Sequence, residues 1–138
     1  MPRVDPARSR HMALIRSKDT KPEMLVRRLV HRMGYRFRLH KKDLPGRPDL
    51  VFPSRRSVIL VNGCFWHGHD CRKGRRRPKS NVEYWEGKIA GNVARDQASL
   101  AALQDGGWRV LVVWECEITP TRLDALEGRV RQFLEETS

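Results

Sequence analysis

The sequence predicts a single α/β domain with a central mixed β-sheet flanked by helices, and three observations support this. The chain has 138 residues, about the length of one domain. Apolar residues recur at helical spacing in some segments and form short, nearly continuous runs of strand length in others. The resulting order is helix, several strands, helix, strand and helix, which is typical of helices packed on the faces of one sheet.

A short helix is expected at 9–16, and a longer one is predicted to begin after Thr20. Thr20 and Glu23 form a capping-box pattern, in which two side chains satisfy free N–H groups of the first turn. Pro22 suits that turn because its missing N–H would have no partner there. The apolar stripe of this helix consists of Leu25, Val26, Leu29, Val30 and Met33. Gly34 is expected to end it.

The next segments are predicted to be strands. Residues 35–40 alternate as an exposed strand would. A turn rich in proline and glycine at 44–48 precedes a short apolar strand at 49–52, and a buried strand is expected at 58–61. Residues 62–81 follow neither period, so we expect a loop there.

The last third of the chain carries the strongest periodic signals. A long helix is predicted at 82–104, ended by Gly106 and Gly107. Its shared apolar face consists of Trp85, Ile89, Val93, Leu100 and Leu103. The run WRVLVVW at 108–114 predicts a core strand, and a final helix is expected at 121–136.

Charge indicates a polyanionic partner. The 28 basic and 16 acidic residues give a formal net charge of +12, and the first 42 residues alone hold 13 basic and 3 acidic side chains. Such a basic field attracts nucleic acid, because neutralising phosphates releases counterions. The alternative is a basic protein whose charge serves only its solubility.

The sequence does not favour a membrane or secreted protein. No apolar run approaches the roughly 20 residues that cross a bilayer, and the first residues lack the apolar region of a secretion signal. We therefore expect a cytoplasmic protein. Its three cysteines would stay reduced there, which leaves them for metal binding, catalysis or burial.

Residues 63–71 (GCFWHGHDC) are rich in metal-binding side chains. Together with a cysteine after the last strand, they supply four candidate ligands: Cys64, His69, Cys71 and Cys116. This set would make a closed tetrahedral Zn²⁺ site, the alternative being three buried cysteines and a surface histidine. If residues alternate here, His67 points elsewhere and offers an imidazole as a general base.

Two carboxylates also have two interpretations each. Asp49 opens a strand near a second strand, where a carboxylate is a natural Mg²⁺ ligand, but Pro48-Asp49 is also ordinary turn chemistry. Glu23 is either the capping partner, which the sequence favours, or a carboxylate that orients a catalytic group.

Aromatic and basic residues adjoin the candidate ligands. Phe65 and Trp66 follow Cys64, and residues 72–79 hold six basic side chains. Aromatic rings on a metal-held loop beside a phosphate-binding run would wedge into a base stack. The alternatives are core packing for the two rings and a solvated loop for the basic run.

Five motifs occur in order along nearly the whole chain. They are MxxxRSKDTKPE at 12–23, LPGRPD at 44–49, GCFWH at 63–67, YWxxKIxxNxxRD at 84–96 and GWRVLxxWEC at 107–116. Together they resemble the very-short-patch-repair mismatch endonucleases, a branch of the PD-(D/E)XK nuclease superfamily with a restriction-endonuclease-like fold. The resemblance implies a Mg²⁺-dependent endodeoxyribonuclease that nicks double-stranded DNA 5′ to the thymine of a T·G mismatch, which arises when 5-methylcytosine deaminates.

The resemblance also implies residue roles. Asp49 would bind the catalytic Mg²⁺, His67 would be the base or position the water, and Glu23 would hydrogen-bond to water or His67. The ligands of a structural Zn²⁺ would be Cys64, His69, Cys71 and Cys116. The DNA-binding residues would be Met12, Phe65, Trp66, Trp85, Lys88 and Asn92. Among these, the three aromatic residues would enter from the major groove and Met12 from the minor groove.

One departure from the wider superfamily is Val61-Asn62-Gly63, where an acidic residue and a lysine would stand. The second Mg²⁺ contact is therefore expected from the Val61 backbone carbonyl. Some members of the repair branch carry Thr and His at the positions of Val61 and Asn62, and this chain has neither.

The leading prediction is thus a mismatch nickase. The alternatives are a restriction or homing-type nuclease of the same fold and a non-catalytic zinc-bearing nucleic-acid module. We expect one domain over 1–138, with a basic arm at 1–20 and a zinc and DNA-wedge loop at 62–81. A monomer would suit a single-strand nick, and accessory repair proteins are further candidate partners.

Overall fold

The computed structural model describes residues 20–41 and 43–136, which form an α/β fold with a four-stranded mixed sheet. The helices are α2 (Lys21–Arg32), α3 (Arg72–Arg75), α4 (Val82–Asp105) and α5 (Leu123–Glu135), with short 3₁₀ turns at η1 (Pro53–Arg55) and η2 (Glu115–Glu117). The strands are β1 (Arg38–Leu39), β2 (Leu50–Phe52), β3 (Ser57–Asn62) and β4 (Arg109–Trp114). This confirms the predicted fold class.

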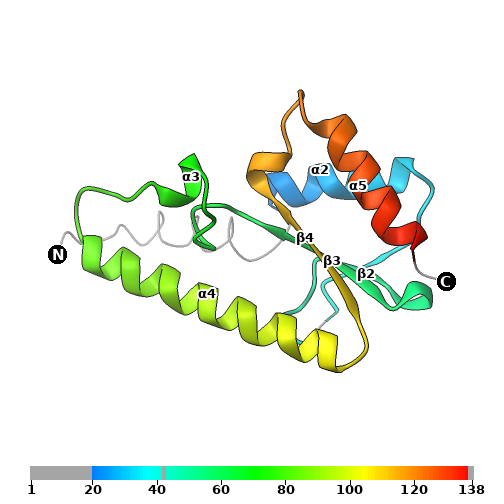
Figure 1. Ribbon diagram of the computed structural model, residues 1–138, viewed down its shortest axis with the longest axis horizontal. Coiled ribbons are helices and arrows are strands. Elements are labelled where there is room, and N and C mark those ends of the chain that lie inside the picture. Colours follow the sequence, from blue (N-terminus) through cyan, green and yellow to red (C-terminus); the bar gives the residue numbers. More distant parts are fainter. Residues whose placement is uncertain (1–19, 42, 137–138) are drawn as a thin grey trace.

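The sheet order is β1-β2-β3-β4. The first three strands run antiparallel, and β4 lies parallel to β3 with Asn62 paired to Trp114. Figure 1 shows α2 and α5 side by side on one face of the sheet and α4 along the other. The long α4 is the crossover between the two parallel strands, as such pairs require.

Successive side chains along a strand point to opposite faces of the sheet, and this divides the core into two layers. Leu50 and Phe52 face α2 and α5, whereas Val51, between them, faces α4. The larger layer includes Val26, Leu29 and Val30 of α2, Ile59 and Val113 of the sheet, and Leu126, Val130 and Leu134 of α5. The smaller layer joins Val51 and Val58 to Leu103 at the end of α4.

The predicted start of α2 is confirmed. Thr20 Oγ1 accepts a hydrogen bond from the Glu23 N–H at 3.3 Å, and Gly34 follows the helix with φ +93°. Leu25, which we placed on the apolar stripe, is 37% exposed, because only the centre of the stripe reaches the sheet. The short helix expected at 9–16 lies outside the described residues.

The structure differs from the sequence prediction in two loops. The exposed strand expected at 35–40 has only two residues, since only Arg38 and Leu39 pair with β2. The loop expected at 62–81 contains the single helical turn α3. Within the described residues, no helix is both long and apolar enough to cross a membrane.

The first half of α4 extends past the sheet and carries the loop that follows β3 (Figure 1). Gly68 of that loop has φ +60°, and a Cβ there would lie 3.0 Å from Ile89 and Val93 of α4. Asn92 Nδ2 donates to the Trp66 carbonyl at 2.9 Å. The loop is therefore fixed on a rigid helix at one edge of the sheet.

Candidate active site and metal centre

Two acidic residues and a histidine meet at the start of β2. Glu23 comes from α2, Asp49 directly precedes β2, and His40 directly follows β1. Their ligand atoms all lie within 4.8 Å of one another, and we call this set the carboxylate cluster. The Asp49 Oδ2 accepts a hydrogen bond of 2.7 Å from the Val61 N–H. Antiparallel pairing sets Leu50, the first residue of β2, opposite Ile59, so Val61, two residues further along β3, lies beside Asp49.

The surroundings of Asp49 in the carboxylate cluster disfavour its ionised form. Burial, together with the neighbouring Glu23 carboxylate, raises the pKa of Asp49 to about 8, although the Val61 N–H and Arg27 act in the opposite direction. Glu23 is 1% exposed and pairs with Arg27, one turn along α2. His40 Nε2 lies 2.9 Å from Glu23 Oε2 and 3.0 Å from Arg27 Nη2.

The donor set of this cluster fits a hard cation. Two carboxylates converge within reach of one ion, and a positive charge there would relieve the repulsion that raises the Asp49 pKa. The Val61 contact with Asp49 runs through the backbone N–H, so the role of its carbonyl stays a prediction.

A second polar pair lies on the loop after β3. His67 Nδ1 is 2.5 Å from Asp96 Oδ2 of α4, and both side chains are partly exposed. In the neutral tautomer that donates its Nδ1 proton to the carboxylate, the other ring nitrogen keeps its lone pair. In the part of the chain that the structure describes, no hydrogen bond joins His67 to Asp49 or Glu23, so of the two partners expected for Glu23, water or His67, only water stays a prediction.

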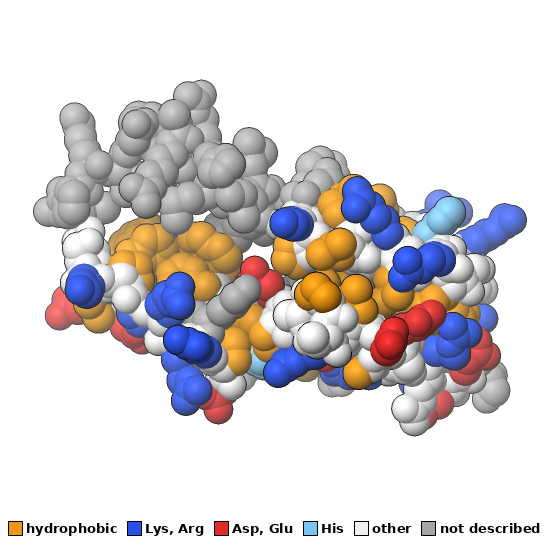
Figure 2. Space-filling view, turned by 90° about the horizontal axis from the view of Figure 1, so that it is seen from above, with side chains coloured by type: hydrophobic (Ala, Val, Ile, Leu, Met, Phe, Trp, Pro, Cys, Tyr) orange, Lys and Arg blue, Asp and Glu red, His pale blue; other side chains and the backbone are white. Residues whose placement is uncertain are grey.

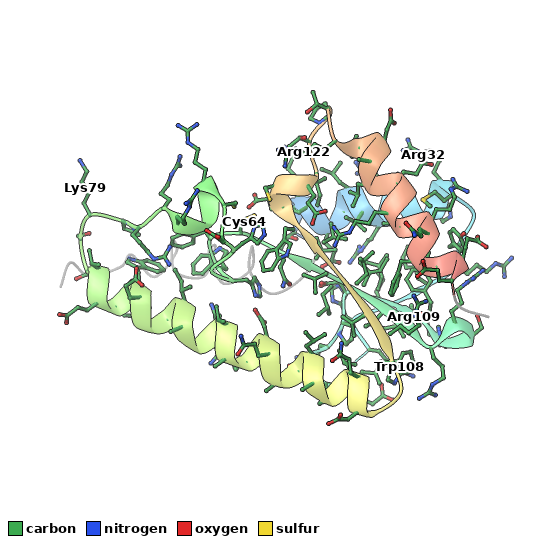
Figure 3. All side chains as sticks on the ribbon, viewed as in Figure 1. Arg32, Cys64, Lys79, Trp108, Arg109 and Arg122 are labelled. Carbon is green, nitrogen blue, oxygen red and sulfur yellow. The ribbon has the colours of Figure 1, made fainter. Side chains whose placement is uncertain are left out.

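The four predicted zinc ligands come together. Cys64, His69, Cys71 and Cys116 place their ligand atoms within 4.8 Å of one another. Because β3 and β4 are parallel and in register at Asn62 and Trp114, the segments that follow them leave the same edge of the sheet side by side. This pairing brings Cys116, which is distant in sequence, next to the loop that carries Cys64. Figure 3 shows Cys64 where the sheet meets the segment that carries α3.

The surroundings of these thiols fit a metal site. Cys64 Sγ accepts the Cys116 N–H at 3.4 Å, and Cys71 Sγ accepts the Gly74 N–H at 3.3 Å, contacts that favour thiolates. Burial and the neighbouring cysteines raise the pKa of Cys64 to about 12, so a cation is needed to hold the cluster ionised. His69 stacks on Trp114 with ring centroids 4.1 Å apart, which orients its imidazole.

Three predicted wedge residues form one aromatic cluster, consisting of Phe65, Trp66 and Trp85. Each ring contacts the other two, with centroid distances of 5.1, 5.6 and 5.7 Å. All three are partly exposed, and Tyr84 packs on Trp85 at 5.2 Å. Figure 2 shows hydrophobic side chains gathered at the end of the molecule where α3 and the start of α4 lie.

The remaining predicted DNA contacts have different surroundings. Asn92 is 8% exposed, holds the Trp66 carbonyl and accepts a hydrogen bond from Arg95, so it fixes the loop in this structure. Lys88 lies one turn before Asn92 on α4 and is half-buried. Met12 lies outside the described residues.

Sequence reasoning missed three residues of these clusters. Asp96 stands in a quoted motif, yet only the packing of α4 on the loop shows that it faces His67. Arg27 and His40 were not singled out at all. Arg27 follows Glu23 by four residues, a spacing that puts both side chains on one helical face and was the available signal.

Comparison with known proteins identifies the family. A family model described as DNA mismatch endonuclease Vsr matches residues 3–73, just over half of the chain. This chain belongs to the Vsr family. The type II nicking enzyme V.XorIIP of Xanthomonas oryzae pv. oryzae is 58% identical over 134 residues, which cover 96% of each chain. The DNA mismatch endonuclease Vsr of Escherichia coli is 43% identical over 111 residues, 80% of this chain and 70% of that protein.

A solved structure supports the same fold. The catalytic domain of the homing endonuclease I-Bth0305I superposes with a TM-score of 0.58 over 83% of this chain and 94% of that one, at 20% identity. Membership in the Vsr family makes the protein an endodeoxyribonuclease that acts on DNA. The alternative of a non-catalytic nucleic-acid module is therefore excluded.

Proposed function

We propose that this Vsr-family enzyme nicks one strand of double-stranded DNA 5′ to the thymine of a T·G mismatch. The observation that carries the proposal is that loop 63–71 holds both His67 and two rings of the aromatic cluster. His67 would accept a proton and the two rings would wedge into the base stack. Because both lie on one rigid loop, the enzyme would cut beside the weakly stacked step that it recognises. The enzyme would act in the cytoplasm, as the sequence predicts. It would act as a monomer, since one nick needs one active site.

The carboxylate cluster would hold Mg²⁺, through Asp49 and the Val61 carbonyl. Bound there, Mg²⁺ would supply charge neutralisation at the phosphate and a lowered water pKa. Glu23 would accept hydrogen bonds from water in the site. His67, held at Nδ1 by Asp96, would take the proton of the attacking water at Nε2.

The four-ligand site would hold Zn²⁺ in a structural role. Four protein ligands close a tetrahedral site and leave no position for a reacting water. The residues Cys64, His69, Cys71 and Cys116 would thereby order the loop that carries His67.

Selectivity would come from the aromatic cluster. A T·G wobble pair stacks less well than a matched pair, so wedging Phe65, Trp66 and Trp85 beside it costs less. Lys88 and Asn92 would assist from the same helix as Trp85, and Met12 would enter from the opposite groove.

The test is a panel of end-labelled duplexes that differ in one base pair: T·G, T·A and C·G, in several flanking contexts. Cleavage of only the thymine-containing strand, 5′ to the mismatched thymine and dependent on added Mg²⁺, is the expected result. Equal cutting of the matched duplexes would instead indicate a restriction or homing-type target. Repeating the panel with purified accessory repair proteins shows whether they alter the rate.

A further inference from the structure

Residues 72–79, here called the basic turn, carry six basic side chains and no acidic one. Arg72, Arg76 and Lys79 are exposed, and the structure shows no hydrogen bond or ion pair from their side chains to any described residue. The Arg75 side chain is 71% exposed, and its Nε donates to the Cys71 carbonyl at 3.4 Å and lies 3.7 Å from the exposed Asp70 carboxylate. Arg72, Arg76 and Lys79 therefore face solvent without a counter-charge among the described residues, and the one ion pair of Arg75 is long and exposed.

The neighbouring Arg77, in contrast, is mostly buried and bonded within the protein. Its side chain is 24% exposed, donates to the Gly74 carbonyl at 2.7 Å and pairs with Glu86 of α4 at 2.5 Å. These bonds tie the basic turn to the helix. Arginines at the other end of the molecule are also used internally, since Arg55 and Arg109 donate to carbonyls of α5.

The basic turn also packs directly on two candidate metal ligands. Cys71 accepts the Gly74 N–H at Sγ and the Arg75 N–H at its carbonyl. A Cβ added at Gly74 would lie 1.8 Å from the His69 carbonyl oxygen, so the two backbones are in contact. The conformation of α3 therefore depends on the conformation of the His69–Cys71 segment.

In the chain, the basic turn links the two elements that carry the aromatic cluster. Phe65 and Trp66 precede it on the loop, and Trp85 follows it on α4. Figure 3 shows Lys79 near the start of α4, at the opposite end of the molecule from Trp108 and Arg109. The basic turn and the aromatic cluster therefore belong to one connected segment, residues 65–85.

We propose that the basic turn is a phosphate clamp on the DNA backbone, set in place by the metal-ligand loop. Arg72, Arg75 and Arg76 would contact phosphates, and Arg77 would act as a positioning residue. Phosphate contacts carry no base information, so the clamp strengthens binding to matched and mismatched DNA alike. The clamp needs only the family's action on DNA and does not depend on which mismatch the enzyme cuts.

The first test compares two triple variants of equal charge loss in the full-length, metal-loaded protein. One is Arg72→Gln/Arg75→Gln/Arg76→Gln, and the control is Arg28→Gln/Arg32→Gln/Arg36→Gln, exposed residues of α2 and the segment after it. Affinity for a matched duplex is measured by fluorescence anisotropy over a series of KCl concentrations.

The clamp predicts that the plot of log affinity against log salt becomes shallower by about 2 to 3 in the first variant, from roughly 0.9 per phosphate contact. The control slope should change by about 1 or less on the same scale. The ratio of mismatched to matched affinity should stay unchanged in the first variant. Equal slope changes in the two triple variants, or a selective loss on mismatched DNA, would overturn the proposal.

The second test addresses the link to the metal ligands. Gly74→Ala forces the His69 backbone to move, whereas Gly128→Ala, on an open face of α5, meets no atom within 4 Å. We expect Gly74→Ala to lose zinc, measured by a chelator-release assay, and to show the shallow salt slope, with Gly128→Ala unaltered in both. Loss of zinc with an unchanged slope would overturn the link.

Discussion

At the scale of single residues, the site depends on charges that the fold holds close together. Asp49 and Glu23 lie in one cluster, and desolvation makes the ionised form of Asp49 costly. Arg27 and His40 surround the Glu23 carboxylate and orient it. His67 is oriented separately, by Asp96 from α4. In the proposed mechanism a cation would be needed beside Asp49, and His67 would act as a base that Asp96 already holds in place.

Asp96→Asn should reduce the nicking rate by about 10²-fold or more, within the range typical of lost acid–base catalysis. An amide donates a hydrogen bond to Nδ1 as readily as it accepts one, so the imidazole loses its fixed tautomer. Single-turnover nicking and DNA affinity are the two measurements. A variant with the normal rate would remove Asp96 from the mechanism, and a loss confined to affinity would give it a binding role.

The raised pKa of Asp49 predicts a pH dependence of stability. The ordinary pKa of 3.8 applies in the unfolded chain and about 8 in the folded one, so between these values the folded protein holds a proton that the unfolded chain releases. The free energy of unfolding therefore falls as pH rises through this window, by at most about 1.4 kcal/mol per pH unit. Asp49→Asn removes this contribution.

Without added Mg²⁺, the difference in free energy of unfolding between Asp49→Asn and the unsubstituted protein should therefore shift in favour of Asp49→Asn as the pH rises from 5 to 8. Urea denaturation at both pH values measures the difference. Parallel pH dependence in the two proteins would show that Asp49 ionises as readily when folded as when unfolded.

At the scale of elements, the register of two strands assembles the ligand cluster. Parallel pairing of β3 and β4 sets Cys64 beside Cys116, although 52 positions separate them in sequence. Metal binding should therefore hold the loop to the sheet and contribute to folding.

Cys116→Ser should lower the zinc content and the melting temperature together, because a hydroxyl is a poor zinc ligand. Metal analysis and thermal unfolding are the measurements, with a sample treated with a chelator as the reference for complete loss. Full zinc occupancy with an unaltered melting temperature would show that Cys116 is not a ligand.

Much of the fold could be predicted from the sequence because its signals are local. The cap at Thr20, the stripe of α2 and the run that became β4 each depend on neighbours in the chain. The contacts of His40 and Asp96 could not be predicted, since they join separate elements and follow from packing. The residue types already indicated the four zinc ligands and the resemblance agreed, and the strand register gives the physical reason that they meet.

At the scale of the whole molecule, the hydrophobic core and the aromatic cluster lie in different parts along its length. The sheet and its two-layer core lie at one end, and half of α4 projects beyond the sheet (Figure 1). The aromatic cluster joins this half of α4, through Trp85, to the loop after β3. Substitutions at the two ends should therefore have different effects.

Trp66→Ala should reduce the preference for mismatched over matched DNA more than it reduces general affinity. Trp108→Ala is the matched control, because Trp108 packs on the smaller core layer and should alter stability without altering the preference. Competition binding with the two duplexes gives both quantities. Equal loss on both duplexes for Trp66→Ala would mean that the ring serves packing only.

The most direct test of the account is single-turnover nicking of a T·G duplex by Asp49→Ala, with Asp43→Ala as the control. Asp43 is an exposed carboxylate in the turn before Asp49, and its side chain is 73% exposed. We predict that Asp49→Ala abolishes nicking while DNA binding persists, and that Asp43→Ala retains both. Nicking by Asp49→Ala at the normal rate would contradict the assignment of the active site to the carboxylate cluster.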